Sequence, residues 1–191
     1  MTDVADVTVA DVMVADPVVM DAVLEVSEDG GELLALDGGM TPAAVAAALA
    51  VIADHNDAGP GDQDGGLVRR LLAADGLLAP GGVRLRDVAT GAVIPPSCCF
   101  GLESWREWAA LAQGEEPVWL GHGPVPELEF TGELVRVSHG EVCVALRQDL
   151  VPDLLYDVQS QLIGFLARVE EWGGSALAGV LDEAFQVTRA P

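Results

Sequence analysis

The residues best suited to chemistry are the cysteines and histidines in the second half of the chain. Such side chains bind soft metals, or serve as nucleophile and base in cysteine enzymes. The candidates are Cys98, Cys99, Cys143, His122 and His139. Structural zinc sites usually separate paired cysteines by a few residues, whereas Cys98 and Cys99 are adjacent. We therefore predict no metal centre and interpret Cys143 as a small apolar core residue on the inward face of a strand, between outward-pointing Val142 and Val144, or with the two faces reversed.

Cys98 and Cys99 directly precede a predicted helix, whose N-terminus would favour the thiolate form. A cysteine enzyme also needs a base, for which His122 is the best candidate. Glu103 and the general acidity act against this chemistry because they raise a thiol pKa. We predict no catalytic residue and no cofactor. The alternatives are a small enzyme or zinc protein centred on Cys98, Cys99 and His122, a vicinal disulfide, or a packing role for the two cysteines.

Three of the four tryptophans and several glutamates lie in the same part of the chain. Tryptophan is enriched in interface hot spots, and an acidic rim would suit a basic partner. Because aromatic residues make up only 5% of the chain, the same tryptophans could instead anchor its core. The predicted partner-binding residues are Trp105, Trp108, Trp119, Glu115, Glu116, Glu127 and Glu129.

The chain is strongly acidic, with 31 Asp and Glu residues against nine basic residues, all arginine, and a net charge of -22. Such a charge repels nucleic-acid phosphates and anionic lipid, so we expect neither nucleic acid nor membrane as a partner. It serves either solubility or the attraction of a basic protein. The absence of lysine is typical of a GC-rich genome, actinobacterial or haloarchaeal. No signal-peptide pattern and no disulfide framework are evident, so we expect a cytoplasmic protein.

Strands and helices follow one another without regular β-α alternation, and hairpins dominate. Apolar runs around turn residues predict hairpins over 22–36 and 83–94 and a meander over 128–146. Helical spacing and end signals predict helices over 42–56, 67–74, 102–113, 150–172 and 176–185. This mixture predicts an α+β fold, an antiparallel sheet of hairpins with a long amphipathic helix packed on it.

We expect an acidic N-terminal tail or edge strand over residues 1–20, followed by a single α+β domain over 21–191. The Gly/Asp-rich stretch 57–66 is the candidate loop or subdomain boundary within that domain. The apolar content of 43–53 runs almost all round the predicted helix, which should therefore be largely buried.

One block resembles a pattern found in small uncharacterised actinobacterial proteins. It reads Cys98-Cys99-Phe-Gly-Leu-Glu-Ser-Trp-Arg-Glu-Trp108 and is followed by Trp119-Leu-Gly-His122. In those proteins an Asp follows the last His, where this chain has Gly123. The resemblance covers roughly residues 95 to 170 and implies no activity. Analogy with immunity proteins of bacterial toxin systems implies a non-enzymatic, acidic protein-binding module that occludes a basic partner.

Overall fold

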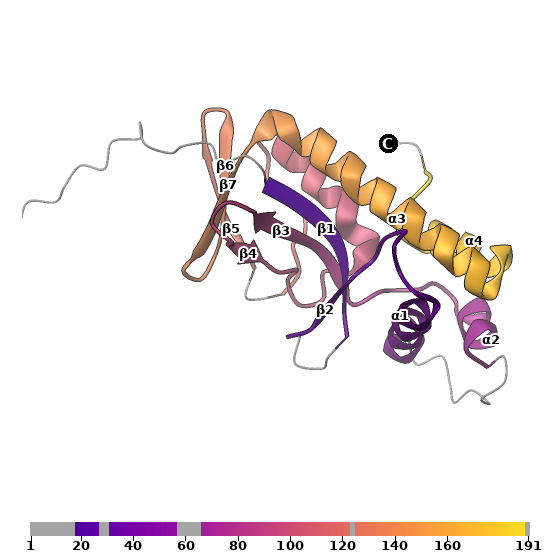
Figure 1. Ribbon diagram of the computed structural model, residues 1–191. Helices are drawn as coiled ribbons and strands as arrows, with labels where there is room; N and C mark the ends of the chain where they lie inside the picture. The colour runs from indigo at the N-terminus through magenta and orange to yellow at the C-terminus, as the bar shows by residue number, and fades with distance from the viewer. Residues whose placement is uncertain (1–17, 27–30, 57–65, 123–124, 190–191) are drawn as a thin grey trace, which may run out of the picture.

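A four-stranded antiparallel sheet with strand order β2-β1-β3-β4 forms the centre of the fold (Figure 1). The computed structural model describes residues 18–26, 31–56, 66–122 and 125–189. The strands of this sheet are β1 (Val18–Glu25), β2 (Leu33–Ala35), β3 (Gly81–Asp87) and β4 (Val93–Ile94). Both predicted hairpins are therefore confirmed, as is the α+β class.

Strand β1 lies between β2 and β3 and supplies much of the core. Its residues Met20, Ala22 and Leu24 alternate along one face and are almost completely buried. Residues 18–20, which we assigned to a tail or edge strand, are the beginning of this interior strand. They pair with the end of β3, a segment more than sixty residues away in the sequence. Residues 1–17 lie outside the described part of the chain, as does most of the candidate boundary 57–66.

Opposite charges meet on the other face of this sheet. Asp21 of β1 is directly opposite Arg84 of β3 and accepts hydrogen bonds from the guanidinium groups of Arg84 and Arg86. Burial raises the pKa of Asp21, but the hydrogen bonds from Arg86 and Arg84 outweigh burial and hold it below its ordinary value. The ion pairs thus link β1 to β3 through side chains as well as through the backbone.

The long helix α3 (Val151–Gly173) packs against β1, as the predicted amphipathic helix should. The 3₁₀ turn η3 (Gln148–Leu150) leads into α3. Within the described ranges, strand β2 pairs only with residues 23–25 of β1, so the preceding part of β1 needs other hydrogen-bond partners. Gln161 of α3 supplies them: its side-chain amide donates to Met20 O (3.0 Å) and accepts from Ala22 N (2.9 Å). Gly164, one turn further along, allows Gly38 to approach the helix closely, since a Cβ at Gly164 would lie 2.6 Å from Gly38 N.

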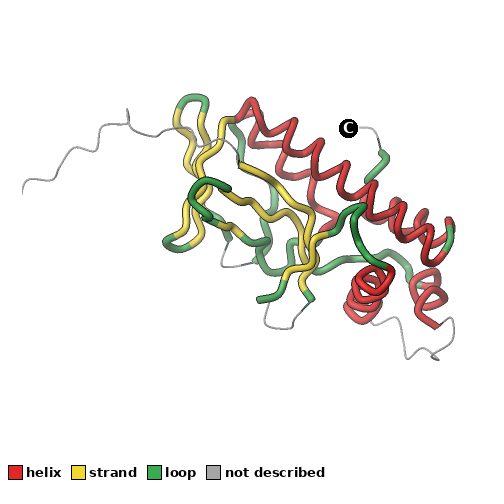
Figure 2. The backbone as a smooth tube through the Cα atoms, viewed as in Figure 1, coloured by secondary structure: helices red, strands yellow, loops and turns green. Residues whose placement is uncertain are grey.

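Three shorter helices gather at one end of the molecule, away from a second, three-stranded sheet formed by residues 127–147 (Figure 2). They are α1 (Pro42–His55), α2 (Gly66–Ala73) and α4 (Ser175–Phe185). Thr41 caps α1 by accepting a hydrogen bond from Ala44 N, as the Thr-Pro signal predicts. The expectation that α1 is largely buried is wrong, because only one face is covered and Ala43 and Ala47 are exposed. Alanine suits an exposed helical position because of its helix propensity.

The segment η2 (Leu102–Gln113) occupies the predicted helical range but is a 3₁₀ helix. Its buried residues recur at every third position, which matches the three residues per turn of a 3₁₀ helix. They are Leu102, Trp105, Trp108 and Leu111. Gly114 ends the helix in the left-handed conformation, with φ +70°.

The predicted meander forms a separate three-stranded antiparallel sheet of strand order β5-β6-β7. Its strands are β5 (Glu127–Thr131), β6 (Leu134–His139) and β7 (Val142–Arg147). It contacts the central sheet through β4 and β3 and lies at the opposite end from α1 and α2 (Figure 1). No helix within the described ranges has the length and apolarity needed to cross a membrane.

Candidate functional site

Cys98 and Cys99 are the two central residues of a tight turn. Phe100 N donates a hydrogen bond to Ser97 O (3.1 Å), which closes the turn. Cys99 has φ +62°, whereas Cys98 does not have a positive φ, the combination of a type II turn. Glycine is the usual residue at the third position of such a turn. Both thiols are exposed, and their sulfur atoms lie 3.3 Å apart.

Two other segments hold the turn in place. His122 N donates to Cys98 O (2.8 Å), and Gly121 is packed so closely that a Cβ there would lie 2.5 Å from that oxygen. Strand β3 also packs against the turn, since a Cβ on Gly82 would lie 3.1 Å from Phe100 O, and Phe100 is buried. A non-glycine residue in the left-handed region costs about 1–3 kcal/mol and persists where its surroundings fix it. The surroundings of Cys99 meet that condition.

A cavity of about 710 Å³ opens beside the two thiols. Its titratable residues come from three other parts of the chain: Glu25 at the end of β1, Asp54 and His55 at the end of α1, and Glu103 of η2. Burial raises the pKa of Glu25, and the charge of His55 lowers it less. The hydrogen bond to Cys99, its charge, burial and the charge of Glu25 all raise the pKa of Cys98. The cavity therefore disfavours additional negative charge.

His122, the predicted base, contacts the turn through its backbone rather than through its ring. The ring lies edge-on to Trp119, with centroids 4.9 Å apart. His55 lines the thiol cavity instead, and nothing in the sequence near His55 indicates this. His139 and Cys143 lie on β6 and β7, where Cys143 is opposite Ser138. Cys143 is exposed and its neighbour Val144 is buried, so the inward position for Cys143 is wrong and the reversed arrangement holds for Val144. No cluster of three or more His, Cys, Asp or Glu residues in the described ranges could hold a metal ion.

The predicted partner-binding tryptophans separate into two groups. Trp105 and Trp108 are each 2% exposed and belong to the core, in line with the alternative interpretation. Trp105 Nε1 donates to Phe185 O (3.0 Å) and so ties η2 to the end of α4. Burial makes both side chains inaccessible to a partner in this conformation. Trp119, by contrast, is 43% exposed.

Trp119 and its neighbour Val118 are exposed and follow the exposed Glu115 and Glu116 in the chain; we call these residues, together with the groove lined by Leu120 and Val125, the Trp119 patch. Its apolar members are Val118, Trp119 and Val125, and Val118 is 94% exposed. Leu120 and Val125 line a shallow groove of about 390 Å³, and two of the predicted glutamates line it as well. All four predicted glutamates, Glu115, Glu116, Glu127 and Glu129, are exposed. Glu129 also faces Arg136 at 3.9 Å, which offsets part of its charge.

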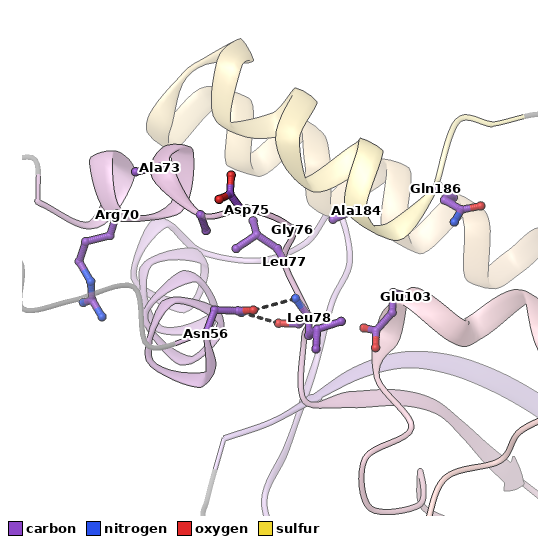
Figure 3. A pocket seen from close by; sticks show the side chains of 11 residues that line it. Asn56, Arg70, Ala73, Asp75, Gly76, Leu77, Leu78, Glu103, Ala184 and Gln186 are labelled. Carbon is purple, nitrogen blue, oxygen red and sulfur yellow. Dashed lines mark hydrogen bonds between the residues drawn. The ribbon is translucent and has the colours of Figure 1, made fainter.

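Another cavity, of about 800 Å³, lies between α2, the end of α1 and α4 (Figure 3). Three of its polar residues, Asn56, Arg70 and Glu103, form contacts within the fold. Asn56 forms two hydrogen bonds with the backbone of Leu78, donating to Leu78 O and accepting from Leu78 N. Arg70 pairs with Asp54 at 2.9 Å, and Glu103 accepts a hydrogen bond from Ala79 N. These side chains already have partners, so this cavity is a weaker candidate than the other two sites.

No protein-family model, curated protein or solved structure matches this chain. Its function must therefore be inferred from the chemistry of its own residues.

Proposed function

We propose that this protein is an acidic, non-enzymatic protein-binding module that uses the Trp119 patch to bind a basic protein. The observation that supports the proposal is the exposure of Val118 and Trp119 next to Glu115 and Glu116. An apolar centre with a charged border is the usual anatomy of a protein interface. A toxin-neutralising immunity protein that occludes a basic partner is the specific form of this function that we propose.

The charge of the patch determines which partner it fits. Glu116 and Glu127 line the groove, Glu115 precedes Glu116, and all three are exposed on a protein whose net charge is -22. A partner surface of the same sign would be repelled, while Lys or Arg around an apolar side chain would complement both the border and the centre. The cytoplasm is part of this proposal, because the cysteines at 98, 99 and 143 are free and fit a reducing compartment.

A photo-crosslinking amino acid at Val118 tests the location of the interface in cells of the source organism. We expect it to capture a basic protein, while the same probe at Tyr156, which is 68% exposed on α3, does not. The captured protein must then bind the purified native chain and lose affinity for Trp119→Ala. Capture of a neutral or acidic protein at position 118, or equal capture at both positions, would refute the proposal.

Association rates measured with that captured partner test the role of the charge. Neutralising Glu115, Glu116 and Glu127 should slow association about tenfold at low salt, because local charge steers encounter. The control variant neutralises three exposed acidic residues elsewhere, Glu141, Asp153 and Asp157, and so has the same net charge. We expect a much smaller effect from the control. Equal effects of the two variants would mean that the charge acts globally, not at the patch.

The alternative of a small enzyme or zinc protein centred on Cys98, Cys99 and His122 is less well supported by the geometry. The His122 ring packs on Trp119, and its contact with Cys98 is a backbone hydrogen bond. The raised pKa of Cys98 also disfavours an activated thiolate at that position.

A further inference from the structure

We infer that Cys98 and Cys99 form a thiol–disulfide exchange site for small disulfides that carry amino groups, and that exchange closes the pair into a vicinal disulfide. This inference does not depend on the proposed function, because it concerns the thiol cavity and not the Trp119 patch. It follows from the distance between the sulfurs, the fixed turn that presents them, and the charge of the cavity beside them.

The geometry places the two thiols ready for closure. Their sulfurs are 3.3 Å apart, whereas a disulfide bond is about 2.05 Å long, so side-chain rotation must bring them about 1.2 Å closer. Both thiols are exposed, so a small disulfide can reach them. The backbone of the turn is fixed by the hydrogen bond from His122 N and by the burial of Phe100, so the two cysteines stay next to each other on a defined turn before any reaction.

The cavity selects the charge of the incoming molecule. It is lined by three carboxylates, Glu25, Asp54 and Glu103, and by one imidazole, His55. Asp54 is paired with Arg70 and Glu103 accepts a hydrogen bond from Ala79 N, so among the described residues Glu25 is the lining carboxylate whose side chain has no hydrogen bond or ion pair. His55 is the one basic residue among the described residues that line the cavity. A cationic disulfide is therefore attracted and an anionic one repelled. The cavity volume of about 710 Å³ is sufficient for a small molecule.

The thiol–disulfide exchange proceeds in two steps. The Cys99 thiol loses its proton to water, and its thiolate attacks one sulfur of the small disulfide; the S–S bond breaks, and the released thiolate takes up a proton from water. The raised pKa of Cys98 keeps its proton in place during this step. Cys98 then loses its proton to water and attacks the Cys99 sulfur, releasing the second small thiol. The protein dithiol is oxidised by two electrons, and the small disulfide is reduced to two thiols.

The product should be easily reduced again. Adjacent residues have Cα atoms about 3.8 Å apart, shorter than the 4.4–6.8 Å that is usual for disulfides. A vicinal disulfide is therefore strained, and strained disulfides are the labile ones. Closure and reopening would act on the turn that His122 N and Gly121 contact.

The test uses three disulfides of similar size: doubly cationic cystamine, neutral 2-hydroxyethyl disulfide and doubly anionic 3,3′-dithiodipropionate. The protein is the full chain with Cys143→Ser, so that the pair holds the remaining thiols. Relative to free dithiothreitol, we expect cystamine to react at least about tenfold faster than the anionic disulfide. Intact-mass analysis should show the loss of two hydrogens and no adduct. A persistent adduct would refute closure.

Single-residue variants distinguish the roles of Cys98, Cys99 and Glu25 in the exchange. Cys98→Ser should retain a stable cystamine-derived adduct on Cys99. Cys99→Gly removes the attacking thiol while placing the favoured residue at φ +62°, so it should fold normally and lose the fast reaction. Glu25→Gln should lower the preference for cystamine about threefold, and the control Glu141→Gln, on an exposed turn, should not.

The background charge of the protein requires its own control, because any thiol on so acidic a chain attracts cations. In a variant with Ser at both 98 and 99, exposed Cys143 is the remaining thiol and reports that background. We expect its preference for cystamine to be clearly smaller than that of the pair. An equal preference would show that the cavity carries no selectivity and would overturn the inference.

Discussion

Replacing Gly164 by alanine separates helix propensity from packing. Alanine is favoured over glycine inside a helix by about 0.8–1.0 kcal/mol. At Gly164, however, the new Cβ would lie 2.6 Å from Gly38 N and 2.9 Å from Gly38 Cα, so two backbone segments must move apart. Overpacking of this kind costs about 1–3 kcal/mol. Gly179, inside α4, has no atom within 4 Å of the corresponding Cβ, so Gly179→Ala gains the propensity alone.

The two alanine variants should therefore differ in free energy of unfolding by about 1–3 kcal/mol, with Gly164→Ala the less stable. For a chain of this length the melting temperatures should differ by about 2–12 °C. Gly38→Ala is the local control, because its Cβ would lie 3.4 Å from Gly164 Cα, an ordinary contact. Thermal and urea unfolding would measure all three. If Gly164→Ala were as stable as Gly179→Ala, the close approach of the loop to α3 would be wrong.

Three further predictions concern single side chains. Because the folded pKa of Asp21 is lowered, its contribution to stability is full above the unfolded pKa and is lost as pH falls through the folded value. The difference in stability between the native chain and Asp21→Asn should thus shrink on acidification in urea titrations. Trp105→Phe breaks a buried hydrogen bond, whereas Trp108 Nε1 is buried without a partner among the described residues. Trp105→Phe should therefore lower the free energy of unfolding by about 1–3 kcal/mol more than Trp108→Phe does. Gln161→Leu should speed hydrogen exchange at the Ala22 amide, whereas Gln161→Glu, which retains the acceptor, should protect it.

Local elements were predictable because their signals are local. The Thr41-Pro42 start of α1, Gly114 at the end of η2 and the turns of the meander each combine a residue type with a backbone requirement. Pairing between distant segments had no such signal, so the interior position of β1 beside β3 was missed. The strict three-residue spacing from Leu102 to Leu111 did indicate a 3₁₀ helix, but it is also compatible with one face of an α-helix.

The candidate sites were predictable only in part, for the same reason. The sequence located the Trp119 stretch and its glutamates, but residue type alone could not show that Trp105 and Trp108 are buried. The adjacency of Cys98 and Cys99 was evident, while the positive φ of Cys99 depends on the packing of Gly121 and Phe100. His55 enters the thiol cavity because α1 ends there, and only the tertiary arrangement determines that.

The 3₁₀ conformation of η2 also determines the distance between the two ends of this helix. At about 2.0 Å per residue its twelve residues extend about 24 Å, whereas an α-helix of the same residues would extend about 18 Å. Its ends join the Cys98–Cys99 turn to the segment that leads to Trp119. Rewinding it as an α-helix would shift one end by about 6 Å and turn Leu111 about half a revolution away from Leu102. Burial of Leu102, Trp105, Trp108 and Leu111 in one row therefore determines the distance between the thiol turn and the start of the 114–122 segment.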